Sequence, residues 1–239
     1  LNYNTFPLSD ILKTLLETGQ REMNNPVEIE FAVNLDVPEG YPKVFNFLQI
    51  RPIVQNKEEI NEKLEDVNND QVIISSNMAM GNGIYNNVFD VVYVKSETFN
   101  PSKTRDIASV IEKLNDTYVR QKKNYVLIGP GRWGSSDPWL GIPVKWAQIS
   151  AARLIIESGL DRYRIDPSQG THFFHNLTSF RVGYFTINPF INDGYYDINF
   201  LNNSPASFED EYIRAVCYEK PVVFKIDGKK QIGVLFKPK

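Results

Sequence analysis

Cysteine and histidine are both scarce in this chain. Its 239 residues include one cysteine, Cys217, and two histidines, His172 and His175. A single thiol excludes a disulfide framework and every cysteine-based zinc site. Two histidines three residues apart could share a metal only with a further ligand, for which Asp166 is the one nearby candidate.

Long apolar runs and a strong excess of charge are also missing. No run of 18 apolar residues occurs, and no charged-then-apolar leader opens the sequence, which begins at Leu1. We therefore expect no membrane span and no secretion signal, a cytoplasmic location, and a chain that is part of something longer. The net charge is only −3, so a nucleic-acid partner, which needs a basic face, is not expected.

The remaining composition is that of an ordinary globular protein, with 42% hydrophobic and 23% charged residues. Apolar spacing predicts helices over 8–25, 103–120, 146–157 and 171–180. Alternating or continuous apolar runs predict strands over 27–35, 44–54, 72–75, 91–94, 125–128, 182–187, 222–226 and 232–236. Interleaved helices and strands predict a mixed α/β protein of the α+β class.

A charged stretch, NKEEINEKLEDVNND, separates two parts of the chain. It has few apolar residues and is typical of a solvated linker. We therefore expect a first domain over residues 1–58, a linker over 59–70 and a second domain over 71–239.

The first candidate site lies on the two strands expected before the linker. Glu28 and Glu30 are two residues apart on a strand and so share a face, and Gln49 and Arg51 share a face of the next strand. Carboxylates suit Mg²⁺, and arginine suits phosphate. If the two strands pair in register, one face carries a nucleotide-phosphate and metal site. A solvated sheet face with a cross-strand Glu–Arg pair explains the same pattern.

This part of the sequence resembles a known family. FPLSDILKTLLETGQREMNNPVEIEFAVN followed by FNFLQIRPIV is similar to the end of the ATP-grasp domain of phosphoenolpyruvate synthase and pyruvate phosphate dikinase. The resemblance implies ATP and Mg²⁺ as cofactors, with Glu28, Glu30 and Gln49 near the metal and phosphates. It also implies that Arg51 contacts the transferring phosphate. The rest of such an ATP site would come from an upstream part of the same chain, so this fragment alone is expected to be inactive.

The second candidate site is His172, in the stretch DPSQGTHFFHNL. Gly170 interrupts regular secondary structure, and Thr171 can cap a helix. His172 would then lie in the first turn of that helix, where unpaired backbone N–H groups favour phosphate binding. A neutral imidazole is also a nucleophile toward phosphorus. Packing of half-buried histidines beside Phe173 and Phe174 remains an alternative.

The order of motifs after the linker resembles the swivelling phosphohistidine domain of the same enzymes. MAMGNGIYNNVFDVVYV, GTHFFHNLTSFRVGYFTI and VVFKIDGKKQIGVLF follow one another as in that β/β/α domain, with an insertion around residues 188–218. The resemblance implies that His172 carries the phosphoryl group. The family has one more residue between the threonine and the histidine, and a Gly-Gly pair that this sequence lacks.

The loop GPGRWGSSDPWLGIPVKW, residues 129–146, is the most unusual stretch. Its glycines could cradle an anion, with Arg132 supplying charge, and exposed Trp133 and Trp139 would form a stacking surface. Tryptophans that cover the apolar underside of the loop explain it equally well. No lysine and Ser/Thr ending marks a P-loop.

Together the two resemblances imply an ATP-dependent phosphotransferase that acts through a histidine on pyruvate, phosphoenolpyruvate or a related small molecule. A non-catalytic docking module that retains the fold is the alternative, since the histidine motif is incomplete. A small-ligand sensor would instead place Trp133 and Trp139 around a cavity beside Arg132.

Overall fold

The computed structural model describes residues 6–23, 27–52, 64–160, 164–166, 168, 177 and 180–239. By internal contacts the chain divides into two compact units, Leu1–Asn56 and Lys57–Lys239.

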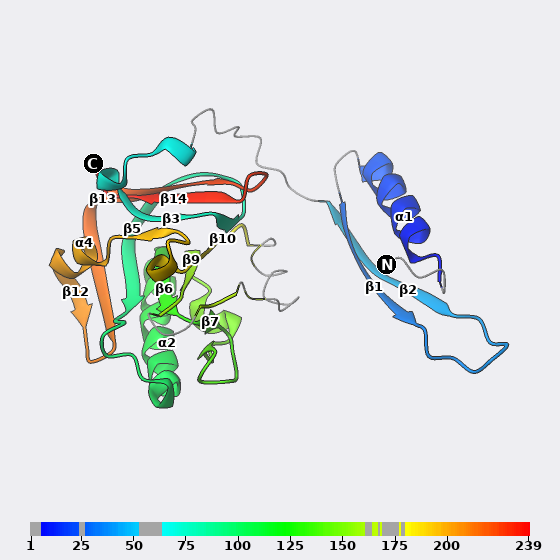
Figure 1. The fold of residues 1–239 in the computed structure, drawn as a ribbon, viewed down its shortest axis with the longest axis horizontal. Coiled ribbons are helices and arrows are strands. Elements are labelled where there is room, and N and C mark those ends of the chain that lie inside the picture. Colours follow the sequence, from blue (N-terminus) through cyan, green and yellow to red (C-terminus); the bar gives the residue numbers. More distant parts are fainter. Residues whose placement is uncertain are drawn as a thin grey trace. The chain divides into compact units, whose positions relative to one another are not determined.

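The first unit is a helix on a two-stranded hairpin (Figure 1). Helix α1 (Leu8–Met23) covers one face of strands β1 (Val27–Asn34) and β2 (Val44–Pro52), which pair antiparallel. At Gly19, an added Cβ would meet the side chains of Ile50 and Val27 at 2.5 and 2.8 Å. The helix therefore lies directly on the apolar face of the hairpin, and the hairpin expected from the sequence is confirmed.

The described part of the second unit is built on one mixed sheet of ten strands. The strands follow the spatial order β11-β3-β14-β13-β5-β6-β9-β10-β4, and β12 pairs with β13. Their bounds are β3 (Val72–Ser76), β4 (Met78–Met80), β5 (Gly83–Val94), β6 (Tyr125–Pro130), β9 (Ala152–Ser158), β10 (Gly183–Ile187), β11 (Tyr195–Tyr196), β12 (Ala206–Glu209), β13 (Ile213–Asp227) and β14 (Ile232–Phe236). Separately, β7 (Arg132–Trp133) and β8 (Gly141–Ile142) form a short parallel pair.

Four neighbouring strands, β5, β6, β9 and β10, run parallel, and the pairings around them are antiparallel. The residues of β6 and most of β9 are buried, which is typical of parallel strands covered on both faces. The sheet also curls on itself: β4, at one end of the order, follows β3, next to the other end, directly in sequence, and β4 and β10 contact β14 and β3. Ser76 Oγ, at the end of β3, donates to the Thr186 carbonyl of β10 at 2.7 Å.

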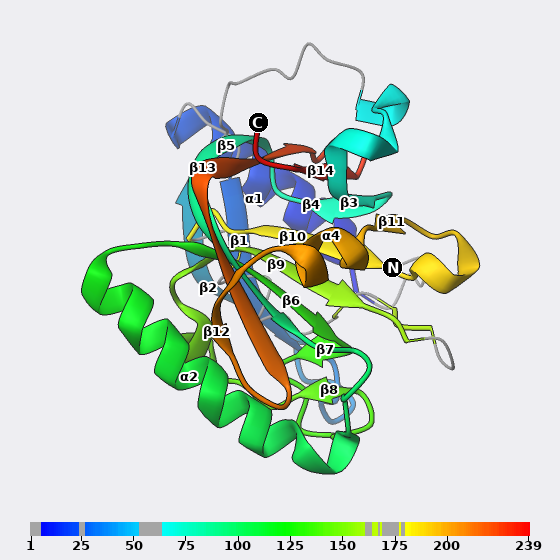
Figure 2. The same cartoon turned by 90° about the vertical axis from the view of Figure 1, so that its left-hand side faces the viewer.

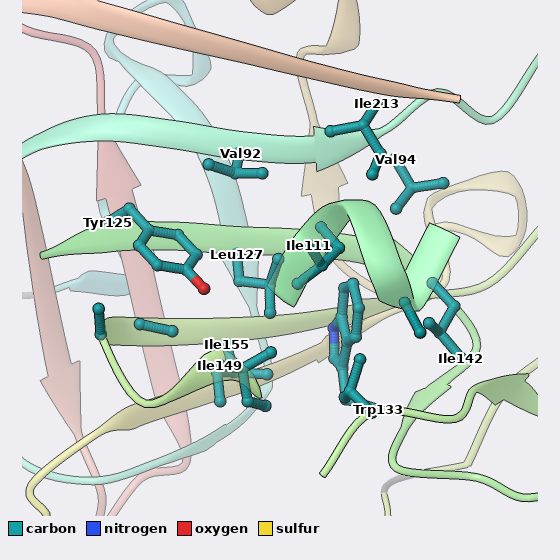
Figure 3. Packing of buried hydrophobic residues seen from close by; sticks show 14 of the residues in the cluster. Val92, Val94, Ile111, Tyr125, Leu127, Trp133, Ile142, Ile149, Ile155 and Ile213 are labelled. Atoms are coloured by element: carbon teal, nitrogen blue, oxygen red, sulfur yellow. The ribbon is translucent and has the colours of Figure 1, made fainter. Parts of the chain in front are cut away.

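Two apolar clusters fill the two sides of the sheet. Helix α2 (Thr104–Gln121) crosses one face, shown in Figure 2, where Ile107 and Ile111 pack among residues of β5, β6 and β9. Figure 3 shows Trp133 and Ile142 in this cluster. The second cluster lies on the other face and draws on β3, β13 and β14 as well, with the short helix α4 (Ile198–Asn203) contributing Leu201.

The prediction of a helix over residues 146–157 is wrong. The chain forms a short 3₁₀ turn, Trp146–Ile149, and then strand β9. The apolar positions fit a helical spacing, but 154–156 is a continuous Leu-Ile-Ile run, and such runs do not distinguish a helix from a buried strand. Pairing with β6 and β10 on both sides decides in favour of the strand.

The remaining elements agree with a mixed protein that has more strand than helix. The strand expected over 91–94 begins earlier, at Gly83, and that expected over 222–226 begins at Ile213. Of the helix expected over 171–180, only Leu177 and Phe180 fall within the described residues. No helix in the described ranges is long and apolar enough to cross a membrane.

Candidate functional site

The β1–β2 hairpin brings its four candidate residues together. Its register pairs Glu28 with Arg51 and Glu30 with Gln49, so two carboxylates lie opposite a guanidinium and an amide. Because side chains alternate along a strand, this set lies on the face opposite Val27 and Ile50, which meet α1. The polar face of the hairpin is therefore the one that the helix leaves open.

Contacts on this face organise the arginine. Arg51 Nη2 donates to Gln49 Oε1 at 2.8 Å, which holds the guanidinium along β2. Arg51, Glu28 and Gln49 are half-buried, while Glu30 is exposed. A partly buried, oriented guanidinium is suited to bidentate contact with an anion such as phosphate.

The oxygen atoms of Glu28, Glu30 and Gln49 are the ligand type that Mg²⁺ prefers. Mg²⁺ commonly takes one or two carboxylates and fills its octahedron with phosphate oxygens and water. Throughout the described part of the chain, no cluster of three or more His, Cys, Asp or Glu side chains could hold a metal alone. A Mg²⁺ ion on this hairpin would need further oxygen ligands from outside the carboxylates, such as phosphate or water.

The predicted carrier His172 lies outside the described residues, as does His175. The segment that leads to it begins at the end of β9, where the carboxyl ends of β6, β9 and β10 lie side by side. This edge of a parallel sheet is where α/β proteins bind ligands. Arg132, after β6, is the predicted site residue that the structure describes here.

Arg132 is half-buried on β7 and contacts the segment after β9. Its Nε donates to the Asp166 carbonyl at 3.2 Å. Its own backbone N–H donates to the Leu140 carbonyl at 2.7 Å, within the same loop. The side chain thus joins the 129–146 loop to Asp166.

The tryptophans of this loop do not form the exposed stacking surface considered above. Trp133 is only 3% exposed, packs in the cluster under α2, and donates Nε1–H to the Ile156 carbonyl at 3.1 Å (Figure 3). Trp139 is 70% exposed. Trp133 therefore covers the apolar underside of the loop, whereas Trp139 presents its ring to solvent.

A buried carboxylate at the same edge was missed by sequence reasoning. Glu157 of β9 is fully buried and accepts hydrogen bonds from the Trp133 N–H at 3.0 Å, Ser168 Oγ at 2.6 Å and the Tyr184 hydroxyl at 2.5 Å. Burial raises its pKa, an effect opposed by the hydrogen bonds from Ser168, Tyr184 and the Trp133 backbone. The available signal was a lone carboxylate directly after the apolar run 154–156, and the predicted helix concealed it.

Tyr184 completes this group from the neighbouring strand. Its hydroxyl also accepts hydrogen bonds from the Ser168 N–H at 2.9 Å and from Thr186 Oγ1 at 3.0 Å. Burial, and then the charge of Glu157, raise the pKa of Tyr184, so the phenol stays protonated and donates to the carboxylate.

No family model, curated protein or solved structure matches the chain. The assignment of a function therefore depends on the residues and the geometry described above.

Proposed function

We propose that this chain is part of an ATP-dependent phosphotransferase similar to phosphoenolpyruvate synthase and pyruvate phosphate dikinase. The observation that carries the proposal is the register of the β1–β2 hairpin, which sets Glu28 opposite Arg51 and Glu30 opposite Gln49. The proposed reaction transfers a phosphoryl group from ATP through a histidine to pyruvate or a related acceptor.

The hairpin residues divide into two roles in this proposal. Glu28, Glu30 and Gln49 hold Mg²⁺ through oxygen atoms, and Arg51 holds the phosphoryl group that is transferred. When bound, Mg²⁺ neutralises the charge that builds up on the phosphate oxygens. The contact between Arg51 and Gln49 keeps the guanidinium oriented, which matters because phosphoryl transfer depends mainly on positioning and charge.

The second unit would carry the acceptor histidine. In the proposal, His172 attacks phosphorus, so a phosphorus–nitrogen bond forms as the phosphorus–oxygen bond to the nucleotide breaks. The described residues 164–166 and 168, which precede His172 in the sequence, bond to groups at the carboxyl edge of β6, β9 and β10 and support this proposal. The finer identity of this unit as a swivelling phosphohistidine domain belongs to the same proposal.

The test uses the natural full-length chain with Mg²⁺ and labelled ATP, and measures the initial rate of label incorporation. Glu30→Gln removes a charged metal ligand, and Arg51→Lys removes bidentate contact. We expect each to lower the rate by about tenfold or more. Glu22→Gln and Arg21→Lys make the same chemical changes on the exposed surface of α1 and serve as matched controls.

The controls decide between the phosphotransferase and the docking module. Equal rates in the hairpin variants and the α1 controls would mean that the polar face is only a solvated sheet surface. An absence of labelling in the unaltered chain, with the fold intact, would favour the non-catalytic docking module.

A further inference from the structure

Residues 164–166 and 168 lie outside regular secondary structure, and hydrogen bonds hold Ile165, Asp166 and Ser168 in place. Arg132 donates to the Asp166 carbonyl, and both Ser168 groups, N–H and Oγ, bond to the side chains of Tyr184 and Glu157. These partners come from the loop after β6, from β9 and from β10. Three separate parts of the sheet edge therefore hold one short piece of chain.

Asn188, directly after β10, holds the same piece at a second point. Its Oδ1 accepts from the Ile165 N–H at 2.8 Å, and its Nδ2 donates to the Ile165 carbonyl at 3.1 Å. Nδ2 also lies 3.1 Å from Asp193 Oδ2. Asn188 is fully buried, so its amide replaces the strand partner that Ile165 would have in a regular sheet.

Burying Glu157 and Asn188 is costly unless their hydrogen bonds are made. Apart from the bonds to Tyr184 and Asp193, these bonds are made to Ile165, Ser168 and Trp133. An apolar core could fill the same space at less cost. The polar groups therefore serve to fix the position of residues 164–168. Ser168 is four residues before His172 in the sequence.

We propose that Glu157 and Asn188 are positioning residues, which hold the segment entering the histidine stretch against the carboxyl edge of the sheet. Glu157 acts through Ser168 and Trp133, and Asn188 acts through Ile165. The link to phosphoryl transfer depends on the function proposed above, whereas the fixation of the segment does not. Neither residue is proposed to touch the nucleotide or the transferring phosphate.

Three backbone amides report on the fixation directly, because each donates to a side chain. They belong to Ile165, Ser168 and Trp133. In Glu157→Gln, the side chain at position 157 would keep one accepting oxygen for three donors, which are the Trp133 N–H, Ser168 Oγ and the Tyr184 hydroxyl. We expect residue-resolved hydrogen exchange by NMR to become at least about tenfold faster at Ser168 and Trp133. Tyr184→Phe, which removes the hydroxyl that accepts from Ser168, should act on the Ser168 amide in the same way.

Tyr125→Phe is the matched control for Tyr184→Phe. Tyr125 is also a buried strand tyrosine, but its hydroxyl donates to Asn115 Oδ1 at 3.2 Å beside α2, at the opposite end of β6. The Tyr125→Phe variant should leave the amide hydrogen exchange of Ile165, Ser168 and Trp133 unchanged. If Glu157→Gln does not fold, Tyr184→Phe provides the comparison, since it removes one oxygen and keeps the ring.

The functional arm measures histidine labelling from ATP in the natural full-length chain. Glu157→Gln and Tyr184→Phe should lower the maximal rate about tenfold and leave the KM for ATP unchanged, because the proposed nucleotide site is on β1 and β2. Folded variants with control-like exchange at Ser168 and an unchanged rate would overturn the inference. Faster exchange in a chain that is never labelled would support the fixation and contradict the proposed function instead.

Discussion

Glu28 lies directly opposite Arg51 across the β1–β2 hairpin. A simple cross-strand pair and a phosphate site both explain this relationship, and exchanging the two residues separates them. The double variant Glu28→Arg with Arg51→Glu keeps opposite charges facing each other. We expect the free energy of unfolding to change by about 1 kcal/mol or less, the usual range for such pairs, while ATP-dependent labelling is lost.

The labelling assay and a denaturant titration of the same preparation check this prediction. The single variants Glu28→Arg and Arg51→Glu, which set like charges opposite each other, are the controls for stability. Normal labelling in the exchanged double variant would identify the residues as a structural pair only.

Trp133 and Trp139 occupy opposite environments in one loop. Trp133→Ala removes a 3% exposed ring and its Nε1–H bond to Ile156, and should lower the free energy of unfolding by about 3–5 kcal/mol. Trp139→Ala removes a 70% exposed ring and should change it by about 0.5 kcal/mol or less. Urea titration followed by circular dichroism measures both. Equal costs would contradict the packing described here.

Alanine substitutions at two glycines of the same loop distinguish the cost of a steric clash from the cost of backbone strain. A Cβ at Gly141 would overlap the Arg132 backbone, so Gly141→Ala should separate β7 from β8 and cost more than about 3 kcal/mol. Gly134 has φ +90° but only ordinary contact, with the Val144 carbonyl at 3.4 Å, so Gly134→Ala should cost about 1–2 kcal/mol. Denaturant titration ranks the two. The reverse order would contradict the close approach of β7 and β8.

The pH dependence of stability tests the environment of Glu157. Burial raises its pKa above the ordinary value of 4.5, against the hydrogen bonds from Ser168, Tyr184 and the Trp133 backbone. Between pH 4.5 and the higher native pKa, the folded protein holds a proton that the unfolded chain has released. The stability that this proton contributes is complete below pH 4.5 and is lost as the pH rises through the native pKa.

The reference for this effect is Glu157→Gln, which cannot titrate. We expect the stability of the unaltered protein, relative to Glu157→Gln, to fall as the pH rises from 4.5, measured by urea titration at several pH values. A relative stability that rises with pH would mean that the pKa of the buried carboxyl is lowered.

Local sequence patterns were sufficient for much of the fold. The hairpin of β1 and β2 follows from alternation over 27–35 and 44–54, and α2 follows from the apolar spacing of Ile107, Ile111 and their neighbours. The sequence placed Glu28 with Glu30, and Gln49 with Arg51, on shared strand faces, but the register that pairs Glu28 with Arg51 came from the structure, which has a register shift between Glu30 and Phe31.

Long-range pairing was out of reach of such patterns. Residues 152–158 form a strand only because β6 and β10 flank them, and the partners of Glu157 are 11 to 27 residues away in sequence. The buried positions of Trp133 and Asn188 depend on the same edge of the sheet. A lone buried carboxylate or amide has no local periodicity, so no spacing pattern predicts it.

The most direct test of the phosphotransferase account is to incubate the natural full-length chain with Mg²⁺ and either β-labelled or γ-labelled ATP. We then measure acid-labile label on the protein, with His172→Ala and His175→Ala as the paired variants, since these are the only histidines of the 239 residues. The account predicts label from the β position that His172→Ala abolishes and His175→Ala retains. Label that persists in His172→Ala, or no label in the folded unaltered chain, would contradict it.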